Sequence, residues 1–421
     1  MKNSKTKKSS HVQRNSKKRK DPSPHVGLAY TFIGPKVKRT VANVKVVGIG
    51  GGGGNAVTRM MEANDRIRGV EFLAINTDAQ DLDYALAHRK IYIGKALTKG
   101  LGAGMNPEIG KQAAEENRSE IGEAIEGADM VFLTAGLGGG TGGGGIPVIA
   151  EIAKEKGILT VAIVTKPFTF EGAQRMANAQ EGLNRLKDKV DALVVIPNDR
   201  IFELINKETP AIRAFGYIDD VLKNAVQGIA DLINMPGIIN VDFADIKAIL
   251  KDAGATMIGI GLASGQDRAV KAANSTLNSP LLEISIDGAR GVLFSVAGGR
   301  DLKMSEINDI AKAVSQNLDA NAKVIFGAYH DRSLKDKSIK VTVIATGFNG
   351  VFNQRLATPT LFMNPELSLR KEPPLAGAQK EKIVHDQEKE KEKTPKSSPL
   401  NKEEQSSDAW EIPAFLRKKK K

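Results

Sequence analysis

Two glycine-rich stretches are the residues of this sequence best suited to chemistry. The first runs from Gly48 to Asn55 and the second from Gly136 to Gly145, with Thr141 as its only hydroxyl side chain. Glycine has no Cβ, so consecutive backbone N–H groups can approach phosphate oxygens at the positive start of a following helix. Two such loops on neighbouring strand ends suit a triphosphate.

A dinucleotide site is the main alternative. The first stretch also satisfies G-x-G-x-x-G, and Glu71 follows at roughly the 20-residue spacing of a ribose-binding acid, as in an NAD-dependent Rossmann oxidoreductase. Such an enzyme has no evident use for the second stretch. The sequence has no G-x-x-x-x-G-K-[ST] motif, and Asn206–Thr209 lacks the aspartate of a Ras-like guanine-reading motif, so a P-loop enzyme is not expected.

Cysteine and histidine usage narrows the class of protein. The 421 residues include no cysteine and five histidines, so neither a disulfide framework nor a side-chain metal site is predicted. The lack of cysteine favours a reducing, cytoplasmic compartment. We find no apolar run of about 18 residues and no secretory signal, so no membrane span is expected.

The formal charge of +12 comes from the ends of the chain. The first 40 residues hold 12 basic residues and one acidic residue, and the residues from Arg355 onward hold 15 and 11. The middle therefore carries a net charge of about −3. Nucleic-acid binding by the folded part is not expected, and the basic residues are typical of solvated tails.

The glycine loops need an α/β sheet to position them. Apolar runs alternate with segments of helical periodicity, which predicts a parallel, doubly wound, Rossmann-like domain over residues 41–210. The predicted strands are Val41–Gly50, Val70–Asn76, Lys90–Gly94, Asp129–Ala135, Leu159–Thr165 and Ala192–Pro197. The predicted crossover helices are Pro107–Glu126, Gly142–Lys156 and Gly172–Lys189.

A long helix and a smaller domain are predicted next. Apolar residues spaced three and four apart predict a buried central helix over residues 211–238, ended by Pro236 and Gly237. A second α/β domain over residues 239–350 follows, with four strands and two helices. The strands are Thr256–Ala263, Gly291–Ala297, Lys323–Ala328 and Lys340–Thr346, and the helices are Asp267–Leu277 and Ser305–Leu318.

Both ends of the chain differ from this pattern. Residues 1–40 are predicted to be a disordered basic extension and residues 351–407 a disordered linker, because neither contains enough apolar residues for a core. Residues 408–421 form a peptide with the only tryptophan, Trp410, and a basic end. Ile412, Phe415 and Leu416 lie three and four apart, which suits a partner's groove.

The order of motifs resembles the FtsZ family of tubulin-like cell-division GTPases. The second glycine stretch is similar to that family's GGGTGTG signature, and the resemblance runs from Val41 to about Phe348. Further matching stretches are Asn76–Asp78, Gly100–Gly104, Phe170–Gly172, Asn240–Asp245, Ile286–Gly291 and the terminal Ile412–Leu416. The resemblance implies a tubulin-like fold, GTP hydrolysis with Mg²⁺ and head-to-tail self-assembly into the division ring at midcell.

The resemblance also implies a nucleotide site. Phosphates would be held by Gly51, Gly52, Gly53, Gly54 and Asn55 of the first loop and by Gly140, Thr141 and Gly142 of the second. Glu171 and Arg175 would contact ribose and phosphate, Phe215 would stack on guanine and Asp219 would accept its N–H groups. From the residues alone, Glu171 and Arg175 also fit a surface ion pair, and Phe215 also fits a core position.

A separate loop, residues 240–245, is implied to be catalytic. In the family, residues corresponding to Asn240, Asp242 and Asp245 enter the nucleotide site of the next subunit, where the carboxylates orient the attacking water. Read alone, Asp242 fits a helix N-cap and Asp245 a first-turn carboxylate. Assembly would then switch on hydrolysis, because phosphoryl transfer depends on positioning.

The terminal peptide implies partners at the membrane. Ile412, Pro413, Phe415 and Leu416 would bind membrane-tethering adaptors of the FtsA or ZipA kind, with the basic end attracted to anionic lipid. One departure lies in the second loop, where Gly143 replaces the family's second threonine. This departure leaves open a filament that binds GTP without hydrolysing it.

Overall fold

The structure, a computed structural model, describes residues 42–348 except residues 63–66, 68, 207, 236, 279–285, 317, 332–333 and 336. The basic extension (1–40), the linker (351–407) and the terminal peptide (408–421) lie outside the described residues. The predicted partner-binding residues Ile412, Pro413, Phe415 and Leu416 are therefore not placed. No described helix is long and apolar enough to cross a membrane.

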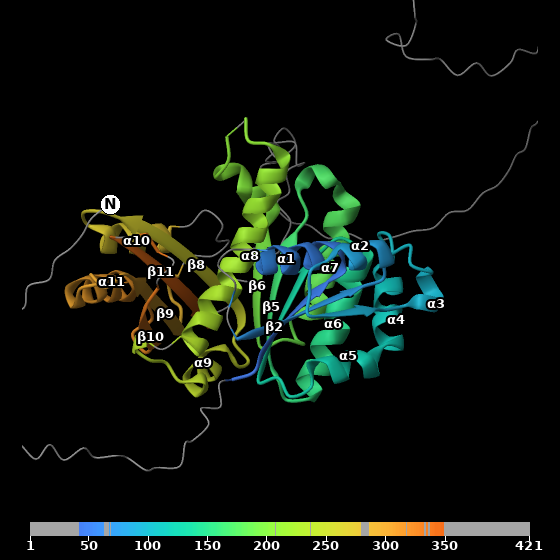
Figure 1. The fold of residues 1–421 in the computed structure, drawn as a ribbon, viewed down its shortest axis with the longest axis horizontal. Coiled ribbons are helices and arrows are strands. Elements are labelled where there is room, and N and C mark those ends of the chain that lie inside the picture. Colours follow the sequence, from blue (N-terminus) through green and yellow to red (C-terminus); the bar gives the residue numbers. More distant parts are fainter. Residues whose placement is uncertain are drawn as a thin grey trace, which may run out of the picture. The chain divides into compact units, whose positions relative to one another are not determined.

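A parallel sheet forms the amino-terminal half of the described chain (Figure 1). Its strand order is β3-β2-β1-β4-β5-β6, and every neighbouring pair is parallel. The strands are rich in Val, Ile and Ala and are buried on both faces, as expected for a doubly wound sheet. They are β1 (Val44–Ile49), β2 (Val70–Asn76), β3 (Arg89–Tyr92), β4 (Met130–Gly136), β5 (Leu159–Lys166) and β6 (Ala192–Pro197).

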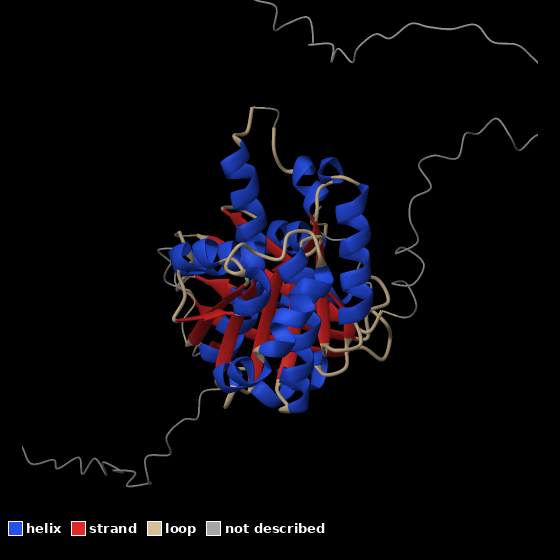
Figure 2. Cartoon of the chain, turned by 90° about the vertical axis from the view of Figure 1, so that its right-hand side faces the viewer, coloured by secondary structure: helices blue, strands red, loops and turns tan. Residues whose placement is uncertain are grey.

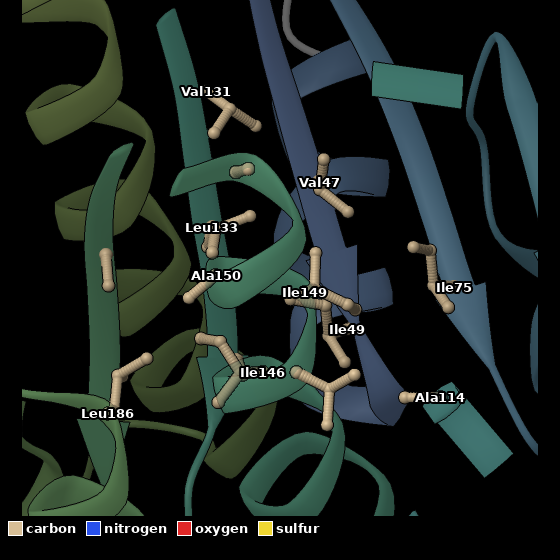
Figure 3. Close-up of a cluster of buried hydrophobic side chains, with 14 of the residues drawn as sticks. Val47, Ile49, Ile75, Ala114, Val131, Leu133, Ile146, Ile149, Ala150 and Leu186 are labelled. Carbon is tan, nitrogen blue, oxygen red and sulfur yellow. The ribbon is translucent and has the colours of Figure 1, made fainter. Parts of the chain in front are cut away.

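Helices cover both faces of this sheet (Figure 2). One face packs against α4 (Pro107–Glu116), α5 (Arg118–Ile125), α6 (Gly140–Glu155) and α7 (Ala173–Leu186). In this core, Ile146 and Ile149 of α6 lie among Val47, Ile49 and Leu133 of the strands (Figure 3). The other face packs against α1 (Gly50–Glu62) and α8 (Ala211–Asn234). Shorter elements are α2 (Ala79–Tyr84), α3 (Lys95–Thr98), η1 (Thr169–Glu171) and η2 (Asn198–Glu203).

The helix predicted over Pro107–Glu126 is wrong in one respect, because the structure has two helices there. α4 ends and α5 begins at Asn117, whose backbone leaves the helical conformation. The Asn117 side-chain oxygen accepts the Gly94 N–H at 3.0 Å and its amide donates to Glu120 at 3.1 Å. Asparagine side chains compete with helical hydrogen bonds in this way, so the break follows from a tertiary contact.

The carboxyl-terminal half adds a mixed sheet to the same unit. β8 continues the parallel sheet next to β6, and the order continues β8-β11-β9-β10-β7, with β8–β11, β11–β9 and β10–β7 antiparallel. The strands are β7 (Gly237–Ile239), β8 (Gly254–Ser264), β9 (Gly291–Gly298), β10 (Lys323–His330) and β11 (Ser338–Thr346). The helices are α9 (Phe243–Leu250), α10 (Arg268–Leu277) and α11 (Met304–Ser315). The short edge strand β7 had no sequence signal.

α8 is the 24-residue helix between the two halves (Figure 1). Leu222, Val226 and Ile229 are buried in a cluster that also includes Leu293 of β9 and Ile344 of β11. One face of α8 therefore packs on residues of both halves. The helix ends at Asn234, close to the proline–glycine stop expected from the sequence.

Candidate nucleotide-binding site

A cavity of about 380 Å³ lies at the carboxyl ends of β1, β4 and β5. This is the edge of a parallel sheet where open α/β folds bind ligands. Residues of α1, α6, α7 and α8 complete its walls. Eight of the predicted nucleotide-binding residues line the cavity: Gly51, Gly52, Asn55, Gly142, Glu171, Arg175, Phe215 and Asp219.

The two glycine loops meet at one end of the cavity. Gly50, at the start of α1, has a φ of +70°. A Cβ at this position would lie 3.0 Å from the backbone nitrogen of Gly142 in α6. Two helix amino termini therefore converge there, and their free N–H groups with the helix dipoles favour an anion such as phosphate.

Several predicted phosphate-loop glycines do not line this cavity. A Cβ on Gly53 would clash with the carbonyl oxygen of Thr134, and one on Gly140 would lie 2.6 Å from the carbonyl oxygen of Gly104. Gly54 instead borders a small neighbouring cavity beside α2. Gly53 and Gly140 are therefore needed for close packing of the backbone.

A later glycine of the second loop, Gly144, also serves packing. A Cβ on Gly144 would clash with the carbonyl oxygen of Pro107 in α4 and lie 2.7 Å from the Lys111 nitrogen. Not every glycine of this stretch therefore serves phosphate binding, because α4 approaches α6 closely at Gly144. Thr141 is also buried, and its hydroxyl lies 2.6 Å from the Thr77 hydroxyl.

Phe215 and Asp219 lie one turn apart near the start of α8. The Phe215 side chain is 52% exposed, so it is not a core residue. Its ring packs edge-on against Phe168, with 5.6 Å between ring centroids. One aromatic ring that faces the cavity from a fixed position can stack on a purine base.

The carboxyl group of Asp219 has a raised pKa. Burial raises the pKa of the Asp219 carboxyl to about 6, and the nearby charge of Asp220 acts in the same direction. The positive charge of Arg59 on α1 opposes the shift. At pH 7 the carboxylate form still predominates, so Asp219 can accept hydrogen bonds from N–H groups of a base.

Glu171 and Arg175 form an ion pair at the cavity wall. Glu171 also accepts the Phe168 N–H at 2.9 Å. The turn that carries Glu171 is held by Asp199, which accepts the Thr169 N–H at 3.0 Å. The expected surface pair therefore exists, but it lies where a sugar or phosphate would have to compete for its two side chains.

Asn198 is a cavity residue that the sequence analysis missed. It follows β6 directly, and its Oδ1 is buried without a hydrogen-bond partner among the described residues. A buried acceptor without a partner costs free energy, so a ligand N–H that reached it would be favoured. Its position just after a parallel strand was the available signal.

The three predicted catalytic residues lie away from the cavity. Asn240 and Asp242 are exposed, and Asp245 is half-buried in the first turn of α9. The Asn240 side chain accepts the Gly237 N–H at 2.7 Å. Asp242 occupies the N-cap position of α9, as its alternative interpretation expected, but its side chain makes no capping hydrogen bond.

The loop and the cavity lie at opposite edges of the sheet. Phe215 and Asp219 near the start of α8 line the cavity, whereas residues 240–245 follow the other end of that helix, which is at Asn234. Fifteen residues of helix separate Asp219 from Asn234, or about 22 Å at 1.5 Å per residue. A chain with this fold cannot bring its own Asp242 to its own cavity.

Mg²⁺ fits this cavity only together with a nucleotide. No group of three or more Asp, Glu, His or Cys side chains in the described part of the chain is placed to hold a metal ion. The two glycine loops offer backbone N–H donors, which do not bind cations. Mg²⁺ commonly keeps several waters and binds through substrate phosphates. A cavity whose N–H groups hold the phosphates suits this kind of Mg²⁺ binding.

The fold and cavity define a class of nucleotide-binding protein in which two glycine loops, without a P-loop, enclose the phosphate end. Family models agree with this class. Residues 43–206 match the GTPase domain of the tubulin/FtsZ family, and residues 254–349 match the C-terminal domain of the FtsZ family.

Solved structures give the same relationship. An empty FtsZ dimer from M. jannaschii is 50% identical, with a TM-score of 0.70 over 74% of this chain and 89% of that one. A point mutant of FtsZ from M. jannaschii is 51% identical, with a TM-score of 0.69 over 73% and 92%. A GTPγS-bound CetZ2 protofilament from Haloferax volcanii, 20% identical with a TM-score of 0.63 over 75% and 96%, shares the fold.

The chain belongs to the FtsZ family, and it is a GTP-binding GTPase. The expected tubulin/FtsZ fold, with an amino-terminal GTPase domain and a carboxyl-terminal domain, is confirmed. The NAD-dependent oxidoreductase considered from the first glycine loop is wrong, because that G-x-G-x-x-G match belongs to a GTPase domain.

Proposed function

We propose that this protein assembles head to tail into filaments and that each subunit completes the active site of its neighbour. The opposite placement of the cavity and residues 240–245 supports this proposal most strongly, since one chain cannot join them. A contact between two different surfaces of identical subunits repeats without closing, which produces a filament. The described chain therefore has half of a hydrolytic site at each edge of its sheet.

The proposed chemistry assigns a role to each group of residues. The two helix termini at Gly51 and Gly142 hold the phosphates, Phe215 stacks on guanine, and Asp219 and Asn198 accept its N–H groups. Asp242 and Asp245 of the next subunit orient the attacking water, while Asn240 holds their loop. Bound Mg²⁺ would neutralise charge on the phosphates, which is a large part of catalysis in phosphoryl transfer.

The cellular role follows from the same proposal. We infer that the filaments form the division ring at midcell, on the cytoplasmic side of the bacterial cell membrane. Residues 412–416 would bind membrane-tethering adaptors of the FtsA or ZipA kind. Many weak peptides on one filament gain avidity from their high effective concentration, so each contact need not be strong.

Turnover as a function of protein concentration tests the proposal. We expect GTP hydrolysis per subunit, measured as phosphate release with Mg²⁺, to collapse below a threshold concentration. Asp245→Ala should lower assembled turnover at least 100-fold, about 2.7 kcal/mol of transition-state stabilisation, and leave GTP affinity unchanged. Asp309→Ala removes an exposed carboxylate of α11 and is the control, with turnover like the wild type.

Three results would contradict the proposal. Specific activity that stays constant down to the lowest protein concentration would mean that each subunit hydrolyses GTP alone. Full activity of Asp245→Ala would exclude a catalytic role for the loop. Filaments that bind GTP but release no phosphate at any concentration would instead support a non-hydrolysing filament.

A further inference from the structure

One buried carboxylate lies where the two halves of the sheet join. Asp191, directly before β6, is 8% exposed. Its Oδ2 accepts the Thr160 N–H at 2.8 Å, and its Oδ1 accepts the Asp252 N–H at 3.3 Å. Its backbone carbonyl accepts the Gly254 N–H at 2.8 Å. Asp191 therefore connects β5, β6 and the turn that follows α9.

That turn has a constrained backbone. Asp252 has a φ of +52° and Gly254 a φ of +66°, and the left-handed region is unfavourable for residues other than glycine. β6 and β8 are paired only through Ala192–Gly254 and Leu193–Ala255. Such a conformation persists only where surrounding contacts enforce it, and the Asp191 bonds supply those contacts.

The turn fixes one end of the helix that carries the catalytic loop. α9 is an eight-residue helix, about 12 Å long at 1.5 Å per residue. Ile246 and Leu250 bury one side of it in the core shared with the sheet. Asp242 and Asp245 lie at its other end, at the N-cap and in the first turn. A shift of the turn would therefore be transmitted along α9 to both carboxylates.

We propose that Asp191 is a positioning residue for GTP hydrolysis, which fixes α9 so that Asp242 and Asp245 reach the neighbouring subunit in productive geometry. This inference rests on the proposed assembly of the active site from two subunits. Asp191 lies at the amino edge of the sheet and takes no part in the cavity at the carboxyl edge. Its effect is thus on the site of the next subunit and not on its own.

The choice of aspartate over asparagine is informative. Two backbone N–H groups point at the two carboxylate oxygens, so both oxygens must accept. An asparagine side chain offers one oxygen acceptor and one NH₂ donor. In Asp191→Asn one of the two N–H groups would face another donor, while the volume of the side chain stays almost the same.

The test uses the full chain with GTP and Mg²⁺. Asp191→Asn should bind GTP as the wild type does and should still assemble, but assembled turnover should fall at least tenfold. Mixed assemblies then locate the defect. Asp219→Ala damages the cavity and keeps the loop, whereas Asp245→Ala damages the loop and keeps the cavity, so the mixture of these two should recover activity.

In such mixtures Asp191→Asn should behave like Asp245→Ala, as a variant with an intact cavity and an impaired loop. Mixed with Asp219→Ala it should recover activity, because its intact cavity receives an intact loop. Mixed with Asp245→Ala it should not. Recovery with Asp245→Ala, recovery with neither partner, or wild-type turnover of Asp191→Asn alone would overturn the inference. If Asp219→Ala and Asp245→Ala fail to complement each other, the two-subunit site itself is wrong.

A glycine pair provides a second variant with a matched control. Gly254→Ala strains the turn from the α9 side, since its φ is +66° and no atom lies within 4 Å of the added Cβ. Gly127→Ala introduces the same strain at a φ of +70°, also in open space, between α5 and β4. We expect equal losses of thermal stability but a loss of turnover for Gly254→Ala only. Equal turnover would overturn the inference.

Discussion

The nucleotide cavity and the loop at residues 240–245 differ in how far one chain completes them. The cavity gathers side chains and backbone from α1, α6, α7 and α8 around the ends of three parallel strands. The loop presents Asn240 and Asp242 to solvent, and neither residue lines the nucleotide cavity or the small cavity beside α2. Nucleotide binding and turnover should therefore be separable by mutation, since each depends on a different edge of the sheet.

The largest effect on the cavity side is expected from Asp219→Ala. Loss of two charge-assisted hydrogen bonds to guanine should weaken GTP binding by about 3 kcal/mol, or roughly 100-fold, measured by titration calorimetry. Asp220→Ala removes the exposed neighbouring carboxylate on the same helix and should leave GTP affinity within about threefold of the wild type. Equal losses from both variants would mean that charge near the cavity, and not the Asp219 contact, governs binding.

A second prediction separates a glycine required for close packing from a glycine in nearly open space. Gly144→Ala places a Cβ against the Pro107 carbonyl, so the free energy of unfolding should fall by about 1–3 kcal/mol. Gly143→Ala in the same helix has only the Gly138 nitrogen, 4.0 Å away, near its Cβ and should be neutral or slightly stabilising. Urea denaturation of both variants measures the difference. A stable Gly144→Ala would show that α4 does not approach α6 this closely.

These glycines show what the sequence could and could not predict. Local patterns were sufficient to predict most of the strands in their order along the chain. The bounds of β2 and β6 were predicted to the residue. The same glycine run, however, contains residues that face the cavity and residues that face α4. Only the tertiary approach of another helix distinguishes them, and no spacing along the chain records it.

The site shows the same limit. Phe215 and Asp219 were placed through a family resemblance, and the fold brings both to the cavity. Asn198 was missed because a single asparagine after a strand is common in turns. Asp191 was missed because its partners, Thr160 and Asp252, lie 31 and 61 residues away along the chain.

A third prediction uses the pKa of Asp219. With a pKa of about 6, this group is mostly a carboxylate at pH 7 and mostly protonated at pH 5, so GTP affinity should fall about tenfold between them. GTP itself also takes up protons as the pH falls. Asp219→Asn should therefore show only the pH dependence that comes from GTP. Identical pH profiles for the wild type and Asp219→Asn would contradict an ionised Asp219 in the complex.

Stability should respond to pH in the opposite sense. Because the folded pKa of Asp219 lies above its ordinary value of 3.8, the nucleotide-free folded state binds this proton more tightly than the unfolded chain. Its contribution to stability is present below about pH 4 and is lost as the pH rises through about 6. Protonation of Asp219 thus stabilises the nucleotide-free fold and weakens the proposed complex with GTP. The ionised side chain lowers the stability of the empty fold but can accept hydrogen bonds from the base.

The smallest effect is expected where this chain departs from its family. Gly143 lies in the first turns of α6, and a side chain there meets almost open space, so Gly143→Thr should fold normally. A hydroxyl near the phosphates adds at most one ordinary hydrogen bond, about 0.5–1.5 kcal/mol, or a two- to tenfold gain in GTP affinity or turnover. Gly143→Val has a similar shape without the hydroxyl and is the control. Equal behaviour of the two variants, or no change in either measurement, would show that the missing threonine does not limit this GTPase.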